Sequence, residues 1–260
     1  MSALSKAFAS DKAFIPFLTL GFPDLETTKP NILAAQKAGA NVIELGIPFS
    51  DPTAEGPIIQ QASLISLNNG YTTKDFLNFV SSIKDEIHVP LVFMTYSNVV
   101  FSYGIEQFMK EASQSKISGI ILADLSFEER EEFESVAKSY QIDLISMIAP
   151  TSQNRIAKIA KQASGFIYLV SSLGVTGMRS SLNQSLEGII EQIRKVSDVP
   201  IAVGFGISNP EQASQMAQIA DGVICGSAII KNIFESQKDN LPVPDQVYSF
   251  VYDMKQAVSC

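Results

Sequence analysis

Two glutamates in the N-terminal half of the chain have the residue type and the setting for acid–base chemistry. Glu44 stands near the end of an apolar run, and the proline- and glycine-rich loop that follows carries Asp51 and Glu55. An ionised carboxylate is costly to bury, so Glu44 needs a partner, a ligand or a shifted pKa. A Glu44 that turns outward, or that caps a loop amide, is the alternative interpretation.

Three glycine-containing loops are candidates for binding a phosphate group. They are Gly174-Val175-Thr176-Gly177, Gly204-Phe205-Gly206 and Gly226-Ser227. Backbone amides beside a helix N-terminus attract phosphate, and a residue without a Cβ lets the phosphate approach closely. Each loop could instead be only a tight turn between a strand and a helix, so the choice depends on the fold.

Several other chemistries are excluded by the residues present. The only histidine, His88, lies in a loop-like Ile-His-Val-Pro segment, which argues against a Ser-His-Asp triad and a structural zinc site. The two cysteines, Cys225 and Cys260, form no plausible disulfide framework, which predicts a reducing cytoplasm. No lysine falls at a predicted strand end, as a Schiff-base aldolase would need, and no acidic cluster has metal-binding spacing. Acid–base chemistry by carboxylates on a phosphorylated organic substrate remains.

The composition indicates one large α/β domain over residues 1–260. The chain is 46% hydrophobic, which is enough for a single core, and its net charge of −8 argues against binding nucleic acid or an anionic membrane surface. The apolar run at 14–20 is too short, and is broken by Pro16, to be a signal peptide or a membrane span.

Eight short apolar segments alternate with helical segments, and no hairpin signal joins them. The predicted strands are 14–20, 41–45, 90–96, 119–123, 142–148, 166–170, 200–203 and 222–225. The predicted helices are 2–9, 27–38, 58–69, 74–86, 105–114, 127–139, 153–162, 182–196, 210–219, one that opens at 226–227, and 242–258. This order predicts a (β/α)8 TIM barrel with extra helices.

The barrel places the candidate residues together, because its active site lies at the C-terminal ends of the strands. Glycine loops after strands seven and eight form a recurring phosphate site in this fold, which favours phosphate over simple turns. A doubly wound sheet would need a Gly-x-Gly-x-x-Gly turn after strand one, and Gly21-Phe22-Pro23 is not one.

Several motifs in register along nearly the whole chain resemble the α subunit of tryptophan synthase. The most specific is Glu44-Leu45-Gly46-Ile47-Pro48-Phe49-Ser50-Asp51-Pro52; the others are the segment 14–21, the loop 174–177, Gly204-Phe205-Gly206-Ile207-Ser208 and Gly226-Ser227-Ala228-Ile229. The resemblance implies cleavage of indole-3-glycerol phosphate to indole and glyceraldehyde 3-phosphate. It also implies no cofactor in this subunit, and a pyridoxal-phosphate β subunit that receives the indole in an αββα heterotetramer.

The resemblance also implies roles for individual residues. Glu44 corresponds to the family's catalytic acid–base, and Glu55 to its second catalytic carboxylate. The residues implied for phosphate binding are Gly177, Phe205, Gly206, Gly226 and Ser227. Those implied for substrate binding are Phe17, Tyr96, Tyr168 and Thr176. For each aromatic residue, plain core packing is the alternative.

The sequence departs from the family pattern at three positions. Glu55 stands where the family has Asp, Ser172 where it usually has Arg, and Ser126 where it commonly has Pro. Glutamate places its oxygens about one methylene further out, and a misplacement of about 1 Å can cost a hundredfold in rate. A catalytically weakened subunit that mainly activates the β subunit is therefore the alternative to an ordinary lyase. A different phosphosugar isomerase on the same fold is disfavoured by the Glu44 motif.

Overall fold

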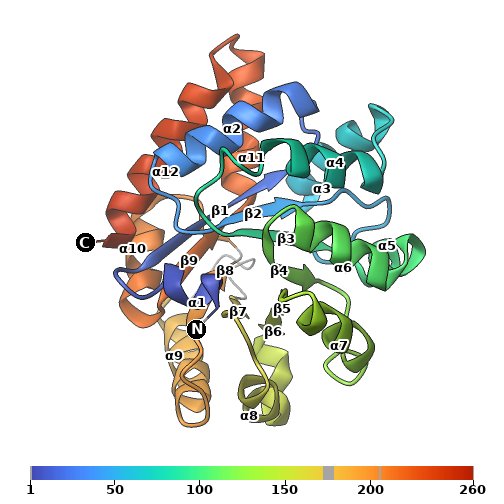
Figure 1. Ribbon diagram of the computed structural model, residues 1–260. Coiled ribbons are helices and arrows are strands. Elements are labelled where there is room, and N and C mark those ends of the chain that lie inside the picture. Colours follow the sequence, from blue (N-terminus) through green and yellow to red (C-terminus); the bar gives the residue numbers. More distant parts are fainter. Residues whose placement is uncertain (1, 172–178, 205, 260) are drawn as a thin grey trace.

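The computed structural model describes residues 2–171, 179–204 and 206–259. Within them, one parallel sheet has the strand order β5-β4-β3-β2-β1-β9-β8-β7-β6, and it curls into a barrel inside a ring of helices (Figure 1). The strands are β1 Ala13–Thr19, β2 Ile43–Gly46, β3 Leu91–Thr95, β4 Ile117–Leu122, β5 Asp143–Leu144, β6 Ser146–Ile148, β7 Ile167–Val170, β8 Ile201–Gly204 and β9 Gly222–Cys225. The predicted TIM barrel is confirmed.

The helices follow the strands in alternation, as the sequence predicts. They are α1 Ala3–Ala7, α2 Leu25–Lys37, α3 Pro57–Asn68, α4 Thr73–Ile83, α5 Ser97–Tyr103, α6 Ile105–Gln114, α7 Glu131–Ser139, α8 Ile156–Lys161, α9 Arg179–Arg194, α10 Pro210–Ile219, α11 Ser227–Lys238 and α12 Val243–Ser259. The structure adds α5, which the sequence did not predict. It also starts α7 at Glu131 rather than at residue 127. The predicted helix at 153–162 is split: a 3-10 turn, Pro150–Arg155, comes first, and α8 follows it.

The predicted fifth strand, residues 142–148, is present but changes neighbours halfway along. Its first part, β5, pairs with β4, and its second part, β6, pairs with β7. At the change, the Ile145 amide donates to the Ile120 carbonyl at 2.9 Å. This strand therefore closes the ring between the two halves of the sheet, and we refer to it as the seam.

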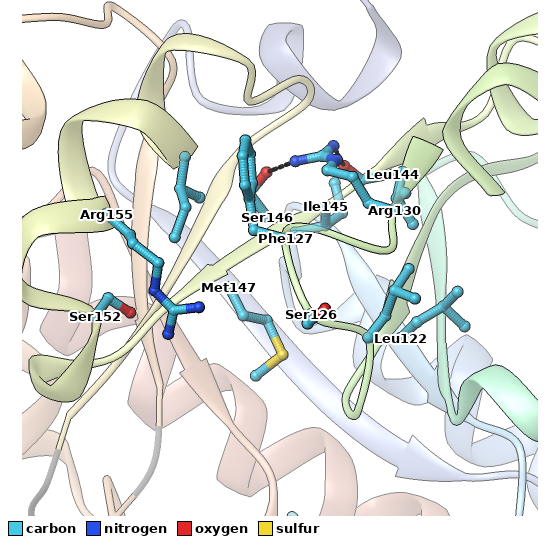
Figure 2. Close-up of a pocket in the computed structure, with 12 residues that line it drawn as sticks. Leu122, Ser126, Phe127, Arg130, Leu144, Ile145, Ser146, Met147, Ser152 and Arg155 are labelled. Atoms are coloured by element: carbon cyan, nitrogen blue, oxygen red, sulfur yellow. Dashed lines mark hydrogen bonds between the residues drawn. The ribbon is translucent and has the colours of Figure 1, made fainter. Parts of the chain in front are cut away.

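A buried arginine supports the seam from outside the barrel. Arg130 is only 6% exposed, and its guanidinium donates to the Leu144 carbonyl at 3.2 Å and to the Ser146 hydroxyl at 2.8 Å (Figure 2). It also lies 3.0 Å from the Glu134 carboxylate. A small hollow of about 180 Å³ lies beside these groups, with Phe127 and Arg155 in its wall. Because the guanidinium already binds the seam and pairs with the Glu134 carboxylate, we assign it a structural role.

The core fills both the inside of the barrel and the layer between the sheet and the helices. Every residue of β1 is buried, as expected for a parallel strand covered on both faces. The last helix, α12, packs against α2 and α10 and so ties the C-terminal end to the first βα unit (Figure 1). Among the described residues, no helix is both long enough and apolar enough to span a bilayer.

Candidate active site

A cavity of about 380 Å³ opens among the C-terminal ends of the barrel strands. Its wall is formed by Phe17, Glu44, Ala54, Glu55, Gly56, Ile59, Met94, Tyr168, Gly206, Ile207, Ser208, Ile224, Gly226, Ser227 and Ala228. The wall is mainly apolar and carries a few convergent polar groups, which is the usual make-up of a small-molecule site. Both glutamates that the sequence singled out face this cavity.

Glu44 projects inward from β2, level with Phe17 on β1 and Val92 on β3. Its residue is only 1% exposed, and its Oε2 atom has no hydrogen-bond partner among the described residues. Burial raises the pKa of the Glu44 carboxyl to about 8, and repulsion by Glu55 adds to the increase. Glu44 is thus a neutral acid near pH 7 that can return to the carboxylate during a reaction.

Glu55 reaches the cavity from the loop that precedes α3, where it is half-buried. Burial raises the pKa of its carboxyl, while a hydrogen bond donated by the Tyr96 hydroxyl acts in the opposite direction. Asp124 contributes further repulsion. The two cavity carboxylates therefore differ: Glu44 has an oxygen without a described partner, whereas Glu55 is held by a phenol.

Two of the three described aromatic candidates line the cavity, and each leans over a glycine. A Cβ added at Gly46 would lie 2.4 Å from the tip of the Phe17 ring, and one at Gly204 would lie 2.4 Å from the Tyr168 hydroxyl oxygen. Both distances are far below van der Waals contact. The absence of a side chain at these two positions on β2 and β8 therefore sets where the two rings can lie.

Tyr96 differs from the other aromatic candidates. It does not belong to the described wall of the cavity, and its hydroxyl faces the loop at residues 53–55. Its ring packs against Phe49, with centroids 5.0 Å apart. The structure thus brings Tyr96 next to Glu55 but not directly to the space where a substrate would lie.

The described candidate phosphate residues line the same cavity, where α11 begins. Gly226 is the N-cap of α11, and Ser227 and Ala228 follow in its first turn, which is the end of a helix that favours anions. Gly206 has φ +77°, a backbone conformation that suits glycine. Three other candidates from the sequence, Thr176, Gly177 and Phe205, lie outside the described residues, as does Ser172.

Comparison with known proteins gives the family. The family model described as "Tryptophan synthase alpha chain" matches residues 4–259. The chain belongs to this family. The tryptophan synthase alpha chain of Lacticaseibacillus casei is 45% identical over 258 residues, which cover 99% of this chain and 96% of that one. The alpha chain of Petrotoga mobilis is 43% identical over 98% of this chain and 99% of its own.

Solved structures of the family agree in fold. The alpha subunit from Legionella pneumophila str. Paris matches with a TM-score of 0.91 and 33% identity, over 99% of this chain and 98% of that chain. A structure of Mycobacterium tuberculosis tryptophan synthase matches with a TM-score of 0.89 and 32% identity, over 100% and 99%. Lyase activity is therefore the general activity of the family to which the chain belongs.

The sequence did not single out several residues of the cavity wall. Met94 and Ile224 lie on β3 and β9, and Ile59 lies on α3. Met94 lies two residues after Val92, the residue of β3 that pairs with Glu44. Ile224 lies two residues before Gly226, a candidate phosphate residue. Because alternate residues of a strand face the same side, the period of two could have identified both. Ile59 carried no comparable signal.

Proposed function

We propose that this cavity cleaves indole-3-glycerol phosphate to indole and glyceraldehyde 3-phosphate. The observation that carries the proposal is the buried Glu44, which lines a mainly apolar cavity at the strand ends and has one carboxyl oxygen without a partner among the described residues. A carboxyl in such a setting is neutral at pH 7 and can act first as an acid and then as a base. Family membership supports the same reaction class.

In the proposed reaction, the neutral Glu44 carboxyl donates its proton to indole C3. Positive charge then develops on the indole ring, and the carboxylate of Glu55 faces it from the loop before α3. The bond between C3 and the glycerol carbon breaks, its electron pair returns to the indole ring, and the glycerol hydroxyl loses its proton to Glu44. Indole and an aldehyde result, and Glu44 is again neutral, so the cycle balances without an added reactant.

The phosphate of the substrate would bind at the start of α11. The amides of Gly226 and Ser227, with Gly206 nearby, offer a site of the kind that barrels form after their last two strands. Gly177 and Phe205 complete the set that the family resemblance implies. Phe17 and Tyr168 would then hold the indole ring between the phosphate and Glu44.

A β subunit is the proposed partner, and it would carry the pyridoxal phosphate and receive the indole in an αββα assembly. Similar chains from Mycobacterium tuberculosis belong to structures of tryptophan synthase, which supports a partner chain. Phe101 on α5 is 62% exposed, the highest value among the described large apolar side chains. Because α5 directly follows the C-terminal end of β3, Phe101 is a candidate contact near the cavity mouth.

Indole release from indole-3-glycerol phosphate tests the reaction. The parent and Glu44→Gln would be compared, with and without a β subunit, because glutamine keeps the shape but cannot exchange the proton. An indole release on the order of 1 per second or faster by the parent, lost in Glu44→Gln, supports a lyase. A parent that stimulates the β subunit yet releases indole no faster than Glu44→Gln would instead identify the weakened activator suggested by Glu55 and Ser172.

Binding of glycerol phosphate tests the phosphate site separately. Gly206→Val places a branched side chain at φ +77°, beside the proposed phosphate. Gly70→Val is the matched control, because Gly70 also has a positive φ, of +83°, and has open space around it. We expect weaker binding only in Gly206→Val. Equal affinity of both variants, measured by calorimetry, would place the phosphate elsewhere.

A further inference from the structure

The Tyr96 hydroxyl makes three hydrogen bonds to one short loop. It accepts from the backbone amides of Thr53 and Ala54, both at 2.9 Å, and it donates to a carboxylate oxygen of Glu55. A phenol has one proton to give and two lone pairs, so these bonds use its full capacity. Little is left with which Tyr96 could bind a substrate.

Tyr96 itself is held rigidly. It is buried, its ring packs on Phe49, and it stands between the last residue of β3 and the first residue of α5. The next residue is fixed as well, because Asp124 accepts from the Ser97 amide at 2.7 Å and from the Ser97 hydroxyl at 2.8 Å. A side chain anchored in the barrel wall therefore holds two backbone amides and the Glu55 carboxylate of this loop.

We propose that Tyr96 is a positioning residue that fixes the 53–55 loop and orients the Glu55 carboxylate toward the cavity. This inference rests on the proposed function, since it concerns the carboxylate that faces the developing charge. It also revises the role that the resemblance implied, because Tyr96 acts through Glu55 rather than through the substrate. The position of Glu55 is then set by Tyr96 and not only by the length of its own side chain.

The charges around Glu55 explain why such a contact is needed. Burial and Asp124 both disfavour an ionised Glu55, and the hydrogen bond from Tyr96 is the largest influence in the opposite direction. Removing that bond leaves the ionised form with less support, so the pKa of Glu55 rises. A reaction that needs ionised Glu55 would then lose activity at a higher pH than in the parent.

Tyr96→Phe tests the proposal, and Tyr103→Phe is its matched control. Tyr103 also donates to a glutamate, Glu111, at 2.5 Å, and burial raises the pKa of both tyrosines to about 12. Tyr103 lies outside the described cavity wall, so its loss tests the general effect of removing a partly buried phenol–carboxylate bond. Both variants keep the ring, which preserves packing.

Three measurements separate the possible results. Hydrogen exchange of the Thr53 and Ala54 amides should speed up in Tyr96→Phe and stay at the parent rate in Tyr103→Phe, because only the first loses its acceptor. The kcat for indole release should fall about tenfold to a hundredfold, the range for losing a hydrogen bond to a charged group, with KM changed less than about threefold. The acid limb of the pH–rate profile should move to higher pH.

Parent-like exchange at both amides would overturn the proposal, whatever the activity. Faster exchange with an unchanged kcat and pH profile would also overturn it, because the loop would be held without consequence for catalysis. A parent that releases no indole would contradict the proposed function alone, since the exchange measurement does not depend on turnover. Equal loss of kcat in both variants would indicate a general structural effect and would overturn the positioning role.

Discussion

Replacing Gly46 with alanine should impair the cavity more than the fold. The new Cβ would lie 2.4 Å from Cζ and 2.7 Å from Cε2 of Phe17. Carbon atoms pack at about 3.5 Å or more, so the tip of the ring must move by about 1.1 Å. The clash involves the far end of one side chain, so we expect a destabilisation near the lower end of the 1–3 kcal/mol typical of overpacking, about 1 kcal/mol.

The displaced ring has a larger effect on function, because Phe17 forms part of the cavity wall. A shift of about 1 Å in a group that positions the substrate can cost on the order of a hundredfold in rate. We therefore expect indole release by Gly46→Ala to fall by between about tenfold and a hundredfold, while the protein remains folded at 25 °C. Indole release and chemical denaturation would be measured on the same preparation.

Gly188→Ala is the control for this prediction. Gly188 lies within α9, and a Cβ there would meet nothing within 4 Å. Alanine in a helix interior is favoured over glycine, so the control should gain roughly 0.5–1 kcal/mol of stability and keep its activity. A Gly46→Ala variant that matches Gly188→Ala in both stability and indole release would refute the argument that the missing side chain positions Phe17.

Three further predictions concern stability. Burial raises the pKa of Glu44 from 4.5 to about 8, so between these pH values the folded state binds a proton that the unfolded state has lost, and the free energy of unfolding should decline as the pH rises from 4.5 to 8. Urea denaturation at pH 5 and pH 8 would measure this decline, and Glu44→Gln should flatten it. Asn31 is 1% exposed and neither amide atom has a described partner, so Asn31→Leu should raise the free energy of unfolding by about 1–3 kcal/mol, and a loss would show that hidden partners exist. Arg130→Met should lower the free energy of unfolding by about 3 kcal/mol, because it leaves the seam unsupported. Arg155 is half-exposed, so Arg155→Met should lower it by less than about 1 kcal/mol, and equal losses in the two variants would contradict the role of Arg130.

The sequence predicted the barrel and the position of Glu44 because both depend on local patterns. Apolar runs with breakers at their ends give strands, and a glutamate at the end of such a run must lie at the mouth of a barrel. The start of α11 was predicted for the same reason, from Gly226-Ser227 after an apolar run. These features need no knowledge of which residues meet across the fold.

The remaining features depend on contacts between distant parts of the chain. The seam changes neighbouring strands at Ile145 because the ring must close there, and no local residue pattern predicts this change. The helix α5 was missed because the segment 97–103 is short and lacks a clear helical period. The bonds of Tyr96 to the loop at 53–55 join two separate βα loops, so the sequence indicated an aromatic in the pocket but not its contact with Glu55.

The seam also divides the chain into two half-barrels. Residues up to 144 carry β1 to β5 in one continuous ladder, and residues from 146 onward carry β6 to β9 in another. The two ladders join through β1 and β9, which pair from Ala13 with Gly222 to Pro16 with Cys225. A chain cut between β5 and β6 would leave each fragment with its own paired strands. Each fragment would also have an apolar sheet edge that only the other fragment covers. Fragment complementation, rather than independent folding, is therefore the expected behaviour of the two halves.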